Sequence, residues 1–162
     1  MKAIIVGIGK NNEIGANHDM AWGRALPDDL KHFKQLSMGK SIIVGRSTFE
    51  HDFRGKPLKD RETIVVTSQH IETHGAVQAR SVEQAYALAK HDIVVAGGGQ
   101  LYAATIDDMD VLYVTEIHAT FPEATVFFPA IDPLIWREVS REHHKVDERN
   151  LYPFDFVEYA RA

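Results

Sequence analysis

An aspartate at the start of a predicted helix is the strongest candidate for acid–base chemistry in this sequence. Segment 26–30, LPDDL, has the proline and the acidic residues with which helices typically begin. Both aspartates are therefore suited to helix capping alone. Asp29, however, lies one turn before Phe33 and two turns before Leu36 on the apolar helix face, whereas Asp28 points away from it. Burial raises the pKa of a carboxyl group, which is the usual condition of a catalytic acid.

Three turns that follow predicted strands carry groups suited to binding phosphate. They are the glycine-rich segment 97–102, GGGQLY, the segment 45–48, GRST, and the segment 67–69, TSQ, with Arg80 before the next helix. Each turn alone is a weak signal, because tight turns, helix caps and surface loops use the same residue types. The carboxyl ends of parallel strands meet at one sheet edge, so together the three turns predict a dinucleotide site.

The histidines do not form a recognisable metal-binding motif. His70 and His74 flank Glu72 in a segment that reads as a loop and lacks a further convincing ligand. His143 and His144 are adjacent, so they point to opposite faces of a predicted strand and cannot share an ion. The chain has no cysteine, which excludes thiolate ligands and thiol nucleophiles. We therefore expect no metal site.

The composition excludes several function classes. The 162 residues carry a net charge of −5, and no segment clusters the cations needed to bind nucleic acid. No apolar run reaches the roughly 18 residues of a membrane span, and no cleavage site follows the short apolar run at the start of the chain. The absence of cysteine fits a reducing compartment. We expect a cytoplasmic protein.

Apolar runs and helical patterns alternate along most of the chain. Strands are predicted at 2–8, 41–45, 63–66, 92–97, 111–117, 135–144 and 152–160, and helices at 27–38, 46–53, 81–91 and 98–106. The first four strands are continuously apolar, as in a parallel sheet, whereas the last three alternate, as in antiparallel strands with one wet face. The pattern predicts one α/β domain over residues 1–162, with helices on both sides of a sheet that has an antiparallel edge. The segments 9–26 and 118–134 are expected to be long functional loops.

Six ordered motifs resemble bacterial dihydrofolate reductase over nearly the whole chain. They are IVGIGKNNEIG (5–15), MAWGRALPDDLKHFK (20–34), IIVGRSTFE (42–50), PLKDRETIVVTSQ (57–69), VVAGGGQLY (94–102) and LYVTEI (112–117). The resemblance implies an eight-stranded, mostly parallel sheet with an antiparallel C-terminal edge and about four helices. It also implies an enzyme that reduces 7,8-dihydrofolate with NADPH, by hydride transfer to C6 and protonation at N5, and that antifolates such as methotrexate or trimethoprim inhibit. A monomer is the simplest expectation for one small domain.

The resemblance also implies roles for individual residues. Asp29 would be the active-site carboxylate, with Trp22 and Thr115 ordering it and Met20 in the lid over the nicotinamide. Arg61 would bind the glutamate α-carboxylate of folate, and the other pterin and tail contacts would be Ile5, Val6, Gly7, Leu30, Phe33, Phe53, Leu58, Ala96 and Tyr102. The NADPH groove would be formed by Gly7, Ile14, Gly15, Gly45, Arg46, Ser47, Thr48, Thr67, Ser68, Gln69, Arg80, Ala96, Gly97, Gly98, Gly99, Gln100, Leu101 and Tyr102.

The sequence departs from the family pattern at the lid and in the cofactor groove. Ala21 stands where a proline often precedes the lid tryptophan, and the segment 23–25 is an insertion. Gln100 replaces a frequent arginine, and the usual aspartate of the loop that braces the lid is replaced near Thr125. Gln100 removes one cation from the cofactor groove, the other changes bear on how the lid closes, and none of them alters the hydride transfer itself.

Two other functions are compatible with a similar fold. A pyrimidine reductase of riboflavin synthesis would keep the cofactor groove but lack the aspartate on the second predicted element, so Asp29, Phe33 and Arg61 argue against it. A non-catalytic module that binds NADPH would oxidise no cofactor in the presence of folate.

Overall fold

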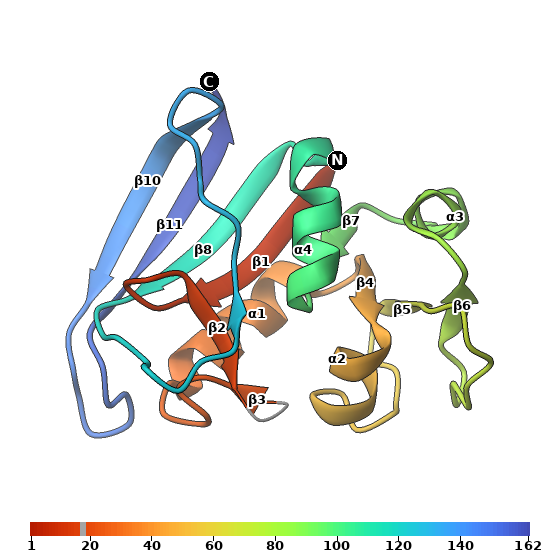
Figure 1. The fold of residues 1–162 in the computed structure, drawn as a ribbon, viewed down its shortest axis with the longest axis horizontal. Coiled ribbons are helices and arrows are strands. Elements are labelled where there is room, and N and C mark those ends of the chain that lie inside the picture. Colours follow the sequence, from red (N-terminus) through yellow and green to blue (C-terminus); the bar gives the residue numbers. More distant parts are fainter. Residues whose placement is uncertain (17–18) are drawn as a thin grey trace.

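A computed structural model describes residues 1–16 and 19–162, and an eight-stranded sheet forms its centre (Figure 1). The strand order is β10-β11-β8-β1-β7-β4-β5-β6. In sequence order the strands are β1 (Lys2–Ile8), β4 (Ser41–Gly45), β5 (Glu62–Val66), β6 (Val77–Ala79), β7 (Ile93–Val95), β8 (Val111–Ile117), β10 (Trp136–His144) and β11 (Phe154–Arg161). All neighbours pair in parallel except β8 with β11 and β11 with β10, which confirms the predicted antiparallel edge.

Four α-helices cover the two faces of the sheet. They are α1 (Pro27–Ser37), α2 (Arg46–His51), α3 (Val82–Leu88) and α4 (Gly99–Thr105), and a short 3-10 helix, η1 (Ile106–Asp108), follows α4. Because side chains alternate along a strand, Ile43 packs with residues of α3 and α4, whereas Ile42 and Val44 pack with α1 and α2. The strands and helices predicted from the apolar pattern are thus present, and most of their ends lie within two or three residues of the prediction.

The two segments predicted as loops contain regular structure. Residues of the first form β2 (Glu13–Ala16) and β3 (Asp19–Met20), and residues of the second form β9 (Val126–Phe127). The three short strands make a separate antiparallel sheet in the order β3-β2-β9. The sequence analysis predicted loops there and missed these strands, because strands of two to four residues are too short to show a period. Residues 17 and 18, within the first segment, lie outside the described residues.

Two further details of the sheet differ from the sequence prediction. β6 has only three residues and was not predicted, since its sequence VQA has no apolar run. β8 was grouped with the antiparallel strands because its residues alternate, but it pairs in parallel with β1 and antiparallel with β11. β8 is the strand at which pairing changes from parallel to antiparallel. Its alternation of apolar and polar residues therefore reflects both of its neighbours.

Glu13, the first residue of β2, connects the small sheet to the segment that precedes β9. Its carboxylate is 2% exposed and accepts hydrogen bonds from the backbone N–H of Asn11 at 2.6 Å and from that of Phe121 at 2.6 Å. The second bond connects β2 to the segment that leads into β9. Two short hydrogen bonds from backbone donors to one buried side chain fix the position of both segments.

Replacing Glu13 with alanine should destabilise the fold. Glu13→Ala leaves two backbone donors without their acceptor, so we expect the free energy of unfolding to fall by about 2 to 4 kcal/mol. Urea denaturation followed by circular dichroism measures the change. The exposed Glu123 of the same segment provides the control, and Glu123→Ala should shift stability by less than about 0.5 kcal/mol. Equal effects of the two substitutions would contradict the assigned role.

Candidate active site

A cleft of about 1130 Å³ opens where β1, β4, β5 and β7 end. Its lining includes Gly7 at the end of β1, Gly45 at the end of β4, Thr67 after β5 and Gly97 after β7. The predicted meeting of these turns at the carboxyl edge is therefore confirmed. The volume lies just above the roughly 300 to 1,000 Å³ range of small-ligand pockets, so the cleft is large enough for a sizeable ligand.

Asp29 lies in the cleft wall, in the first turn of α1. The hydroxyl of Thr115, on β8, donates a hydrogen bond of 2.5 Å to its Oδ1. Burial raises the pKa of the Asp29 carboxyl to about 6, although the hydrogen bond from Thr115 acts in the opposite direction. The group therefore exchanges a proton near neutral pH, as a general acid requires.

Asp28 has a different role from its neighbour. Asn150, which is 1% exposed, donates from its side-chain amide to the Asp28 carboxylate at 2.9 Å, and Arg149 forms an ion pair with it at 3.0 Å. The side-chain oxygen of Asn150 accepts from the Asp28 backbone N–H at 3.2 Å. These contacts anchor the start of α1 away from the cleft, and they leave Asp29 as the cleft carboxylate.

Gly7 allows an indole ring to approach the carboxylate. A Cβ atom at Gly7 would lie 2.7 Å from Cζ2 of Trp22 and 3.5 Å from Oδ2 of Asp29, so any larger residue would displace the ring. Trp22 is 7% exposed, and its ring packs against Phe121 with the centroids 5.8 Å apart. Trp22 thus closes one side of the Asp29 environment against water.

The glycine turn after β7 leaves open backbone at the other end of the cleft. Gly97 has a φ of 122°, which side chains other than glycine rarely adopt, and a Cβ there would lie 3.3 Å from Oγ1 of Thr48. Its carbonyl accepts from the N–H of Gly45 at 2.8 Å, which joins two of the predicted phosphate turns. Because the turn carries no side chains, a concave surface of backbone stays open to the cleft. A ligand can therefore lie directly against the backbone of this glycine cradle.

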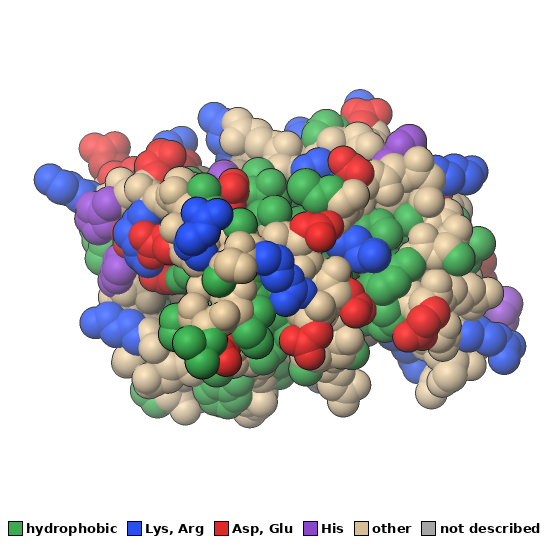
Figure 2. All heavy atoms as spheres, turned by 90° about the horizontal axis from the view of Figure 1, so that it is seen from above, with side chains coloured by type: hydrophobic (Ala, Val, Ile, Leu, Met, Phe, Trp, Pro, Cys, Tyr) green, Lys and Arg blue, Asp and Glu red, His purple; other side chains and the backbone are tan. Residues whose placement is uncertain are grey.

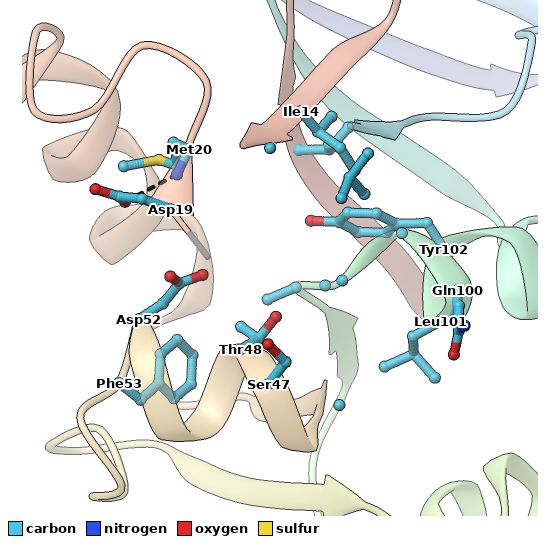
Figure 3. A pocket seen from close by; sticks show the side chains of 18 of the residues that line it. Ile14, Asp19, Met20, Ser47, Thr48, Asp52, Phe53, Gln100, Leu101 and Tyr102 are labelled. Carbon is cyan, nitrogen blue, oxygen red and sulfur yellow. Dashed lines mark hydrogen bonds between the residues drawn. The ribbon is translucent and has the colours of Figure 1, made fainter. Parts of the chain in front are cut away.

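Figure 3 shows how the side chains from different elements face this cleft. Ser47 and Thr48 project from α2, and Tyr102 projects from α4 with its hydroxyl donating to the carbonyl of Ile5 at 2.8 Å. Arg46, at the start of α2, forms an ion pair with Glu50 at 2.9 Å and a hydrogen bond with the side chain of Gln69. The donors predicted from the second and third turns are therefore in contact.

The cleft also contains charged residues that the sequence analysis missed. Asp19 of β3 and Asp52 after α2 lie on the same side of it, and Arg24 also lines it (Figure 3). Burial and the nearby Asp19 raise the pKa of Asp52, whereas Arg24 and His51 lower it. Acidic residues at a helix end carry no signal in the sequence, so only the fold reveals this pair.

Most predicted site residues line the cleft. The structure brings together Ile5, Val6, Gly7, Ile14, Gly15, Met20, Trp22, Asp29, Leu30, Phe33, Gly45, Arg46, Ser47, Thr48, Phe53, Leu58, Thr67, Ser68, Ala96, Gly97, Gly98, Gly99, Gln100, Leu101 and Tyr102. Thr115 lies behind the wall and touches Asp29. Arg61, Gln69 and Arg80 lie outside the lining, and Arg61 donates to the Ser37 hydroxyl at 3.1 Å at the end of α1.

Comparison with known proteins identifies the family. The dihydrofolate reductase family model matches residues 1–161. The chain belongs to the dihydrofolate reductase family. It is 37% identical to a dihydrofolate reductase of Bacillus subtilis, with 99% of this chain and 95% of that protein covered, and 36% identical to the type 3 enzyme of Salmonella typhimurium, with 98% and 97% covered.

A solved structure of the same family has the same fold. It is a dihydrofolate reductase from Enterococcus faecalis in complex with NADP(H) and RAB-propyl, with a TM-score of 0.89 and 37% sequence identity. The match covers 99% of this chain and 96% of that one. The described residues of this dihydrofolate reductase family member thus have the fold of that structure.

The segment around Thr125 contacts β2. Thr125 donates its backbone N–H to the carbonyl of Gly15 at 2.9 Å. Val126 reaches the glycine turn, since a Cβ at Gly99 would lie 2.5 Å from its Cγ1. Backbone pairing between β2 and β9 and the buried Glu13 thus connect these segments without an aspartate at this position.

The raised pKa of Asp29 should be measurable as a pH dependence of stability. The folded chain binds this proton more tightly than the unfolded chain, so the stabilising effect is present below pH 4 and is lost as the pH rises through about 6. We expect Asp29→Asn, which cannot ionise, to gain about 2 to 4 kcal/mol relative to the wild type between pH 4 and pH 7.5. Urea denaturation of both proteins across this range tests it, and a difference that does not change with pH would rule out the shift.

Proposed function

We propose that the chain reduces 7,8-dihydrofolate to 5,6,7,8-tetrahydrofolate, with NADPH as the reductant, in tetrahydrofolate and one-carbon metabolism. The observation that carries the proposal is the protonatable Asp29 in a cleft whose other end is a glycine cradle. The reaction consumes one hydride and one proton. The hydride goes from C4 of the nicotinamide to C6 of the pterin, and the proton goes to N5.

Asp29 and its neighbours are suited to holding the pterin. The carboxylate accepts hydrogen bonds from the exocyclic amine and a ring nitrogen, and the Thr115 hydroxyl fixes its orientation at 2.5 Å. Phe33 and Leu30 of α1, with Ile5 and Ala96, supply apolar walls for a flat ring. Trp22 shields Asp29 from bulk water, and burial raises the pKa of its carboxyl to about 6, so that Asp29 can promote the protonation of N5 by a proton from solvent.

The cofactor end of the cleft fits a dinucleotide. Gly97, Gly98 and Gly99 present backbone N–H groups and no side chains to a pyrophosphate, and Ser47 and Thr48 add hydroxyl donors from α2. Arg46, Thr67 and Ser68 are suited to the phosphate of the adenosine part. These described residues are therefore suited to binding NADPH, the cofactor of the family's reaction.

Three assignments outside the lining belong to the same proposal. Arg61 would bind the glutamate carboxylate of the folate tail by turning from Ser37, and Gln69 and Arg80 would contact the adenosine phosphate from the exposed surface. We also propose that residues 1–162 act as one domain, in a monomer in the cytoplasm. Among the described residues, no helix is long and apolar enough to cross a membrane.

A spectrophotometric assay at about 340 nm tests the function and the role of Asp29. NADPH oxidation should require dihydrofolate and be blocked by methotrexate, and Asp29→Asn should reduce turnover by about 10² to 10⁴ while NADPH binding is kept. For the wild type, kcat/KM should fall about tenfold per pH unit above the pKa of about 6, because the protonated form is lost.

The control for this assay is NADPH binding, measured by fluorescence with both proteins. Near-normal turnover of Asp29→Asn at pH 7 would refute the role of the carboxyl. NADPH binding by the wild type without oxidation in the presence of dihydrofolate would instead indicate a non-catalytic module.

Arg46 provides a separate test of cofactor choice. If its guanidinium binds the 2′-phosphate, Arg46→Gln should raise the KM for NADPH by about 10- to 100-fold, the worth of a charge-assisted hydrogen bond, and leave the KM for NADH unchanged. Steady-state kinetics with the two cofactors measure the ratio. Lys56, an exposed cation in the segment after α2, gives the control variant Lys56→Gln, which should change neither value. A rise in both KM values for Arg46→Gln would assign it a structural role.

A further inference from the structure

Two histidines and an aspartate meet on the sheet face opposite Asp29. Asp155 of β11 lies between Glu116 of β8 and His143 of β10 in the strand register, and His118 directly follows β8. Because side chains alternate along β8, Glu116 points away from the face that carries Thr115. The sequence analysis found no metal site, since it compared His143 only with its neighbour His144 and not with a residue on another strand.

The ligand atoms of this cluster lie close together. Nε2 of His118 is 3.0 Å and Nδ1 of His143 is 2.6 Å from the same oxygen, Oδ1 of Asp155, and all three atoms lie within 4.8 Å of one another. In a tetrahedral site with bonds of about 2.0 to 2.1 Å, ligand atoms are roughly 3.3 Å apart. Small rotations of the two imidazoles would therefore create a site without moving the backbone.

Burial gives the three ligands different freedom. The side chain of Asp155 is 8% exposed, whereas those of His118 and His143 are 36% and 54% exposed. The carboxylate is thus a fixed anchor, and the imidazoles can turn and can be reached from solvent. Figure 2 shows histidine side chains among charged side chains at the left end of the molecule, which in Figure 1 is the end with β10 and β11.

The surroundings favour a cation and orient the carboxylate. Arg141 donates to Oδ2 of Asp155 at 2.6 Å, and its guanidinium also forms ion pairs with Glu116 and Glu138. Three carboxylates therefore surround one guanidinium. The bond from Arg141 to Oδ2 fixes the orientation of the Asp155 carboxylate and leaves Oδ1 facing the two imidazoles. Such orienting contacts are typical of the residues around metal ligands.

We propose that His118, His143 and Asp155 form a site for one divalent transition-metal ion, and that Zn²⁺ suits it best. Two imidazoles and one carboxylate are a ligand set that Zn²⁺ accepts, with water in the fourth position. Mg²⁺ prefers oxygen ligands and does not match this set. The ion would connect β8, β11 and β10, the three strands at the antiparallel edge of the sheet, so its binding should stabilise the fold.

Calorimetry with tag-free, chelator-treated protein tests the proposal directly. Titration with ZnCl₂ in a non-coordinating buffer at pH 7.5 should give one ion per chain, and MgCl₂ should give no binding heat. His118→Ala and His143→Ala should each weaken binding by at least about tenfold, the lower limit for losing even a residue that only orients a ligand. The exposed His70, in a loop between β5 and β6, supplies the control His70→Ala, which should bind as the wild type does.

Thermal unfolding provides a second readout that does not depend on enzyme activity. At a Zn²⁺ concentration a hundredfold above the Kd, Tm should rise by about 5 to 10 °C in the wild type and in His70→Ala. It should not rise in His143→Ala. His143→Gln, which keeps a hydrogen-bond donor to Asp155, distinguishes loss of the metal site from loss of the fold, and circular dichroism without metal checks that each variant is folded.

The outcomes separate a metal site from a purely structural cluster. Binding and stabilisation that are lost with either histidine support the proposal. Absence of both effects in the wild type, or equal effects in the wild type and the two histidine variants, would overturn it and leave the cluster as a hydrogen-bonded brace of β10 and β11. Neither result depends on whether dihydrofolate is the substrate.

Discussion

The hydrogen bond between the Thr115 hydroxyl and the Asp29 carboxylate is the contact on which the active-site geometry depends. It connects Asp29 in the first turn of α1 to Thr115 of β8, two residues that are 86 positions apart in the chain. Burying a carboxylate costs free energy. Asn150, Arg149 and Pro27 fix the start of α1 and so hold Asp29 in its buried position. One turn of slippage in α1 would place another side chain opposite Thr115, so the anchoring of Asp28 determines the position of Asp29.

The same constraint explains where the chain uses glycine. Gly7 makes room for the indole of Trp22 beside Asp29, and Gly97 and Gly99 leave the strand-to-helix turn free of side chains. A cleft for two ligands needs walls made of backbone, because side chains on every strand end would fill it. Ordering glycine residues costs conformational entropy. Close packing of Thr48, Tyr102 and Val126 around the glycine turn holds the turn in one conformation.

The sequence predicted those parts of the molecule that repeat a local pattern. Apolar runs located seven strands of the main sheet, and Pro27 with the following acids located α1 to within a residue. β6 and the small sheet of β2, β3 and β9 have too few residues for a period, so hydrogen bonding to distant segments determines them. Site residues at strand ends were predictable because the carboxyl ends of parallel strands lie at the same edge of the sheet. Asp52 and Arg24 were not, since only the fold brings them to the cleft.

The β8–β11 pair shows why proximity in sequence is a poor guide to shared chemistry. Thr115 and Glu116 are adjacent, as are Asp155 and Phe156, yet alternation sends one of each pair to the cleft side and the other to the opposite face. The cleft side keeps a carboxyl group that burial leaves protonatable. The other side holds Asp155 ionised among donors from Arg141, His118 and His143. Carboxyl groups on the two faces of one sheet thus differ in protonation: on one face Thr115 of β8 meets Asp29 of α1, and on the other the strand register places Asp155 of β11 beside His143 of β10.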